Sequence, residues 1–66
     1  MSIVKVIEIL SSSPKSWEDA TAKAIKRASK SIKNIRSAYV QDQSVTVAND
    51  KVKEYRVALK VTFELN

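Results

Sequence analysis

The chain has 66 residues, a formal net charge of +5, and neither cysteine nor histidine. It therefore forms no disulfide, no Ser-His or Cys-His nucleophile, and no zinc site built from cysteine or histidine. A single core is barely sufficient to stabilise so short a chain, and association with other copies is the remaining common source of stability. We expect one domain, residues 1–66, that assembles with copies of itself.

The hydrophobic fraction of 44% is ordinary for a globular protein and argues against disorder. No apolar run approaches the ~20 residues that cross a bilayer. The opening "MSIVKVIEIL" carries Lys5 and Glu8, unlike the uninterrupted apolar core of a signal peptide. We expect a soluble, cytoplasmic protein without a membrane partner.

Residues 3–10 alternate in a way that predicts a strand buried on much of both faces. The following "SSSP" is typical of a turn and is expected to stop that strand. In "SWED", Ser16 has the position of a helix N-cap, and Asp19 lies three residues on, where it can reach back to the Ser16 backbone N–H.

Residues 17–33 have a helical period. One arc of the predicted helix is apolar or small and is expected to face a sheet: Trp17, Ala20, Thr21, Ala24, Ile25, Ala28 and Ile32. The opposite arc is basic: Lys23, Lys26, Arg27, Lys30 and Lys33. No aromatic residue interleaves with these cations and no nucleic-acid-binding motif is present, so we interpret the basic arc as a solvated outer face with no specific nucleic-acid partner.

Two long strands complete the chain. The segment "IRSAYVQDQSVTV", residues 35–47, is rich in β-forming residues, yet neither of its alternating sets is cleanly apolar. "ANDK" predicts a hairpin turn at Asn49 and Asp50, and residues 52–65 alternate cleanly as a third strand. The order β-α-β-β predicts an α+β fold: a three-stranded antiparallel sheet, partly wrapped around one helix, with the third strand in the centre.

The predicted elements differ in length. Strands of about 13 residues extend ~43 Å, whereas a helix of about 17 residues extends ~26 Å. The helix can cover only part of one sheet face, and nothing in the chain covers the other. We expect that face to meet other copies of the chain.

The sequence closely resembles the dodecins, from Val4 to Leu65. The segments that carry the resemblance are "KVIEI", "SPKSWEDA", "AIKRASKSIKNIR" and the alternating pattern from Tyr55 to Phe63. The resemblance implies a hollow shell of twelve subunits that binds a flavin, riboflavin or flavin mononucleotide, for storage rather than turnover. It also implies ligand pockets formed by the second and third strands of neighbouring subunits.

The resemblance also implies which residues form the ligand site. At two of these positions the chain departs from the family pattern. Flavin-binding dodecins carry a stacking tryptophan where this chain has Ser37, and a glutamine after a tyrosine where it has Arg56. The matching ligand-binding positions are therefore Ser37 and Arg56, with Tyr39 as a candidate replacement for the missing ring. Loss of a stacking ring costs roughly 1–3 kcal/mol by comparison with base stacking, so we expect weak flavin binding.

A second interpretation stays open. Some dodecin relatives without the stacking tryptophan are regarded as calcium-binding, and Asp42 is the best carboxylate candidate for a metal site shared between copies. A flavin-free shell of this kind would bind divalent cations or act as a scaffold. The seven acidic residues show no pair at a catalytic spacing, so we do not expect an enzyme.

Overall fold

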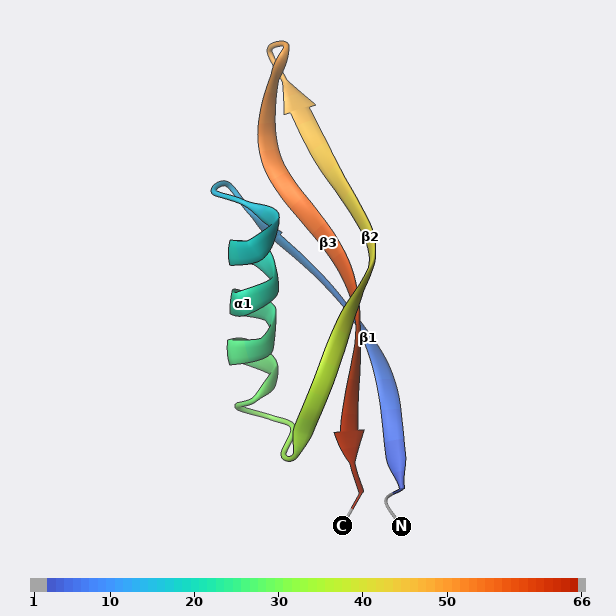
Figure 1. The fold of residues 1–66 in the computed structure, drawn as a ribbon. Helices are drawn as coiled ribbons and strands as arrows, with labels where there is room; N and C mark the ends of the chain where they lie inside the picture. Colours follow the sequence, from blue (N-terminus) through green and yellow to red (C-terminus); the bar gives the residue numbers. More distant parts are fainter. Residues whose placement is uncertain (1–2, 66) are drawn as a thin grey trace.

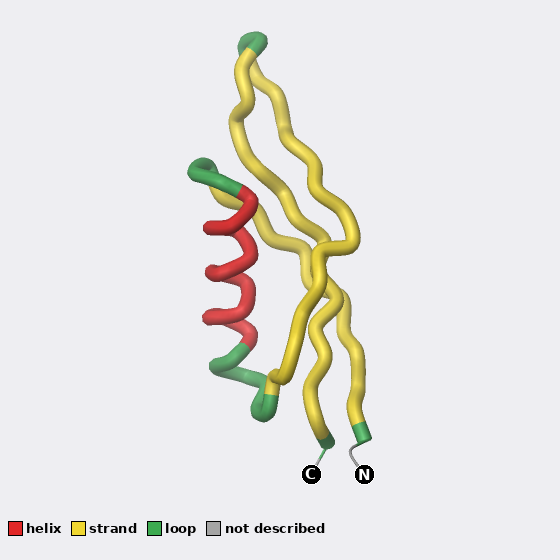
Figure 2. Tube along the Cα trace, viewed as in Figure 1, coloured by secondary structure: helices red, strands yellow, loops and turns green. Residues whose placement is uncertain are grey.

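Alternating apolar side chains on the last strand organise the fold. The computed structural model describes residues 3–65, with β1 at Val4–Ser13, α1 at Trp17–Ala28, β2 at Ile35–Ala48 and β3 at Lys51–Glu64. The three strands form one antiparallel sheet in the order β1-β3-β2, and α1 lies against one side of it (Figures 1 and 2). The predicted fold class and the central position of the third strand are confirmed.

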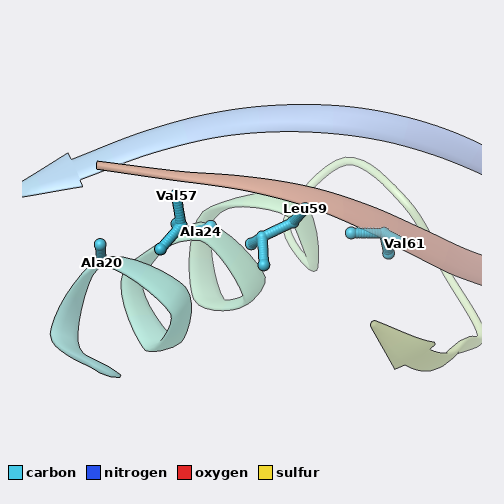
Figure 3. Close-up of a cluster of buried hydrophobic side chains, with 5 residues drawn as sticks. All are labelled: Ala20, Ala24, Val57, Leu59 and Val61. Carbon is cyan, nitrogen blue, oxygen red and sulfur yellow. The ribbon is translucent and has the colours of Figure 1, made fainter. Parts of the chain in front are cut away.

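The buried core lies between β3 and α1. Val57, Leu59 and Val61 point from β3 toward the helix, where Ala20 and Ala24 meet them (Figure 3). Two small alanines on the buried face let the helix backbone approach the sheet closely. The sides of the core are closed by half-buried residues that include Ile7, Ile9, Trp17, Ile25 and Ile35. The apolar arc predicted for the helix is therefore the one that packs.

Bulges in the pairing explain why β2 lacks a simple alternation. Its register against β3 shifts between Ile35 and Ser37 and again between Val40 and Asp42, so Arg36 and Gln41 are extra residues. Each extra residue reverses the alternation that follows it. The side chains of β2 that share the α1 side are consequently Ile35, Ala38, Val40, Gln43 and Val45, and those on the other side are Ser37, Tyr39, Asp42, Ser44 and Thr46.

The first strand is longer than predicted, because the serines continue it. Ser11, Ser12 and Ser13 pair with Val57, Arg56 and Tyr55 of β3. Two of the three hydroxyls also donate hydrogen bonds to residues of α1. Ser11 Oγ donates to the Ala20 carbonyl at 2.9 Å, and Ser13 Oγ donates to Asp19 at 2.5 Å. Hydrogen-bonding partners on α1 thus outweigh the turn preference of serine.

The expectation that β1 is buried on both faces was wrong for the single chain. Ile7 and Ile9 face the core, but Val6 and Leu10 are 52% and 69% exposed. The reason is that α1 covers one side of the sheet only.

The helix is shorter than predicted. It ends at Ala28, and the N–H groups of Lys30 and Ser31 bond to carbonyls three residues back, which tightens the chain into turns. Asn34 then takes a left-handed backbone with φ of 65° and starts the path into β2. The hairpin turn is as predicted, with φ of 53° at Asn49 and 62° at Asp50.

The start of the helix is fixed by a small polar network. Ser16 Oγ accepts from the Asp19 N–H at 2.9 Å, as predicted for an N-cap. The Asp19 carboxylate does not bond back to Ser16 as expected; it accepts from Ser13 and pairs with Lys23 at 3.0 Å. The hydrogen bond from Ser13, followed by Lys23, lowers the pKa of Asp19 below its ordinary value of 3.8. The network joins the end of β1 to the first turn of α1.

We predict that Asp19→Asn lowers the melting temperature at neutral pH more than the matched variant Glu18→Gln, which removes the neighbouring charge. A carboxyl whose pKa is lower in the folded state stabilises the fold above its ordinary pKa, and this contribution disappears as the pH falls through the folded pKa. The gap between wild type and Asp19→Asn should therefore close below about pH 4. Melting curves at several pH values check this, and a gap that stays constant with pH would contradict it.

Candidate functional site

The sheet surface that points away from α1, here called the open face, carries polar and apolar side chains from all three strands. No helix among residues 3–65 covers it (Figures 1 and 2). The strand register places the following residues on it: Val4, Val6, Glu8, Leu10 and Ser12 of β1; Glu54, Arg56, Ala58, Lys60, Thr62 and Glu64 of β3; and Ser37, Tyr39, Asp42, Ser44 and Thr46 of β2.

A shallow pocket of about 250 Å³ lies on the open face. In the register, Arg56 pairs with Ser12 and Ser44, and the next row pairs Ala58 with Leu10 and Asp42. The pocket is lined by these side chains together with Ser11 and Val57. Two of the predicted site residues, Asp42 and Arg56, are thus brought together.

Asp42 and Arg56 give the pocket its charge. They are the two charged residues in its lining, and both are exposed. Neither forms an ion pair within the part of the chain that the structure describes. They lie on adjacent strands but one row apart, where side chains are diagonal rather than direct neighbours. A carboxylate and a guanidinium are therefore both available to a ligand.

The other two predicted ligand residues lie elsewhere on the open face. Ser37 pairs with Thr62, and Tyr39 pairs with Lys60, whereas Arg56 lies nearer the start of β3. The six residue steps along β3 from Arg56 to Thr62 amount to ~20 Å. Ser37 and Arg56 do not share a pocket within one chain, so a ligand that contacts both would need one of them from another copy.

Trp17 lies on the other side of the sheet. Its ring meets Tyr55 edge to face, with centroids 5.1 Å apart, and its Nε1–H donates to the Ser44 carbonyl at 3.0 Å. This confirms its predicted packing role against the sheet. It therefore does not replace the stacking ring that is absent at Ser37.

The sequence-based search for site residues missed further polar groups near the pocket. Ser12 lines it, and its hydroxyl donates to Glu54 at a long 3.4 Å. Glu8 lies on the same face, opposite Lys60. The alternation of β3 could have indicated that Glu54 shares a face with Arg56, whereas the contribution of β1 depends on its register and on the extension of the strand through the serines.

One chain does not supply a complete metal site. Among the described residues, no three acidic, cysteine or histidine side chains gather closely enough to hold a metal ion. The acidic residues of the open face are spread along it, and Glu64 is engaged by Arg36 at 2.8 Å. A cation at Asp42 would need most of its oxygen ligands from outside this chain.

The helix of residues 17–28 is too short and too polar to cross a membrane, and no other helix in residues 3–65 could do so.

Comparison with known proteins identifies the family. The Dodecin family model matches residues 3–66. Calcium dodecin of Mycobacterium tuberculosis is 43% identical over 65 residues, covering 98% of this chain and 92% of that protein. A crystal structure of that calcium-chelating protein, described as having a novel calcium-binding site, is 42% identical over 98% of this chain and 93% of that one, with a TM-score of 0.85.

Other dodecins share the backbone at lower identity. A variant of the T. thermophilus dodecin has a TM-score of 0.94 and is 30% identical, covering 100% of this chain and 98% of that one. The dodecin of Streptomyces davaonensis has the same TM-score at 25% identity, covering 98% and 96%. Matches over nearly the full length of both partners, in sequence and in fold, place the chain in the dodecin family of small, non-catalytic binding proteins.

Proposed function

We propose that this chain forms a dodecin-like homo-oligomer whose open face binds calcium. The observation that carries this proposal is the Asp42 carboxylate, which lines an open-face pocket without an ion-pair partner in residues 3–65. Support comes from the 43% identity to a protein named calcium dodecin. The proposed function is binding without catalysis.

Two residues of the pocket offer ligands that suit a hard cation. Calcium takes six to eight oxygen ligands, among which carboxylates are preferred. Asp42 supplies a carboxylate, and Ser44, two residues along β2, supplies a hydroxyl in the same pocket. Because Asp42 is the one carboxylate that lines the pocket among residues 3–65, the site would be completed by neighbouring copies or by smaller ligands, and symmetry would repeat it.

Flavin binding is a second candidate, which family membership favours. It is weaker for this chain, because Ser37 cannot stack on a ring and Arg56 cannot accept a hydrogen bond. We propose flavin as a low-affinity ligand at most, with the calcium site as the main function.

The first prediction from the proposed function is the size of the assembly. Uncovered apolar residues on the open face, such as Val6 and Leu10, need a partner surface. By family resemblance we expect twelve subunits, so light scattering should give close to twelve times the chain mass of 7.4 kDa. Dilution that separates subunits should also unfold them. A folded monomer at micromolar concentration would contradict both expectations.

The second prediction concerns calcium. Calcium should raise the melting temperature of wild type in a concentration-dependent way, and Asp42→Asn should abolish the rise. Asp50→Asn is the matched control, because it removes the same charge from the hairpin turn, outside the pocket, and asparagine tolerates the left-handed backbone there. An equal response of both variants would show that Asp42 is not a ligand.

The third prediction concerns flavin. Wild type should bind riboflavin with a dissociation constant above ~1 μM, because the stack and the glutamine are missing. Ser37→Trp combined with Arg56→Gln should tighten binding more than either change separately. Quenching of riboflavin fluorescence measures all four proteins. Tight binding by wild type would show that another residue, such as Tyr39, already stacks on the ring.

A further inference from the structure

The open-face pocket combines features that one bound cation does not explain. Its two charged residues are Asp42 and Arg56, so the lining is close to neutral overall. A guanidinium in the same pocket repels a divalent cation placed at Asp42. It also offers five N–H donors in a planar fork that matches the oxygens of phosphate.

The hydroxyls beside Arg56 are further groups that could bind an anion. Ser12 and Ser44 are its cross-strand partners on either side, and both line the pocket. Ser44 Oγ makes no hydrogen bond within residues 3–65, and the bond from Ser12 to Glu54 is long at 3.4 Å. Ser11 differs, since its hydroxyl is already bonded to the Ala20 carbonyl on the α1 side. The Arg56 guanidinium is therefore flanked by one hydroxyl without a hydrogen bond in residues 3–65, that of Ser44, and by one that is only weakly engaged, that of Ser12.

We propose that the pocket binds calcium and a phosphate monoester together, the cation at Asp42 and the phosphate at Arg56 with the hydroxyls of Ser12 and Ser44. This rests on the proposed calcium binding at Asp42. Phosphate oxygens would supply part of the cation's coordination, since no three acidic side chains gather among residues 3–65. Arg56 thereby becomes a ligand-binding residue for the anion rather than a neighbour that weakens the metal site.

Charge balance selects a phosphate monoester over a carboxylate. Asp42 and Arg56 cancel, so bound calcium leaves two uncompensated positive charges. A phosphate monoester carries about −1.5 to −2 near pH 7 and neutralises most of this charge, whereas a carboxylate or sulfonate carries only −1. Three phosphate oxygens also allow one group to contact the metal and the guanidinium at the same time.

The experiment is calorimetric titration of the assembled wild-type protein with calcium, in chloride buffer and in the same buffer with methyl phosphate. Methyl phosphate should tighten calcium binding at least about fivefold, the lower end of typical coupling between two ligands. Titrating methyl phosphate with and without calcium should give the same factor, because coupling is reciprocal. Methanesulfonate, a tetrahedral monoanion, should have a smaller effect.

Two variants locate the anion. Arg56→Gln should keep calcium binding in chloride buffer and lose the enhancement by methyl phosphate. Lys60→Gln is the matched control, since it removes an open-face cation that does not line the pocket, and it should keep the enhancement. Calcium binding that needs Asp42 but is indifferent to methyl phosphate would overturn this inference and leave the proposed function standing. An enhancement that survives in Arg56→Gln would also overturn it. Absence of calcium binding in both buffers would instead refute the proposed function.

Discussion

One helix can bury only one face of a sheet, and the rest of this molecule depends on that constraint. The 12 residues of α1 extend ~18 Å, whereas the molecule is 50 Å long. The helix seals the core around Leu59 and leaves the hairpin of β2 and β3 extending past it (Figure 1). Side chains that the helix does not reach stay exposed in the single chain, and on the open face these include both apolar residues, such as Leu10, and charged ones, such as Asp42.

The bulges in β2 allow the two faces to differ. Without the extra residue at Gln41, Val40 and Asp42 would lie on the same face, and a carboxylate would point toward the helix side of the sheet. With it, Val40 pairs with Leu59 on the helix side and Asp42 pairs with Ala58 on the open face. A single inserted position thus separates the packing residue Val40 from Asp42, the candidate cation ligand on the open face.

Much of the fold was readable from the sequence, because its strongest signals are local. The clean alternation of β3 fixed its two faces, and Ser16 and Asn49 marked a helix start and a turn. The bulges could not be predicted, because they arise from pairing with a neighbouring strand. In the sequence of β2 they leave only two alternating sets of residues, neither of which is cleanly apolar. The extension of β1 depended on hydroxyl partners such as Asp19, which are close in space only after folding.

The candidate site was predicted in part. Asp42 and Arg56 were named from the sequence and do meet in one pocket, while Ser37 and Tyr39 lie in other rows. The resemblance to dodecins suggested candidate ligand-binding positions, but it could not indicate which of them lie in one pocket of a single chain. Ser12 was missed because its role depends on the register of β1 against β3.

We have proposed that this protein binds a cation on its open face, at Asp42 in particular. A crystal structure grown with calcium, with the metal located by its anomalous scattering, is the decisive measurement. We expect a peak beside the Asp42 carboxylate with oxygens at roughly 2.3–2.6 Å, not all of them from one chain. A peak at the hairpin turn or on the outer face of α1, with none at Asp42, would contradict it.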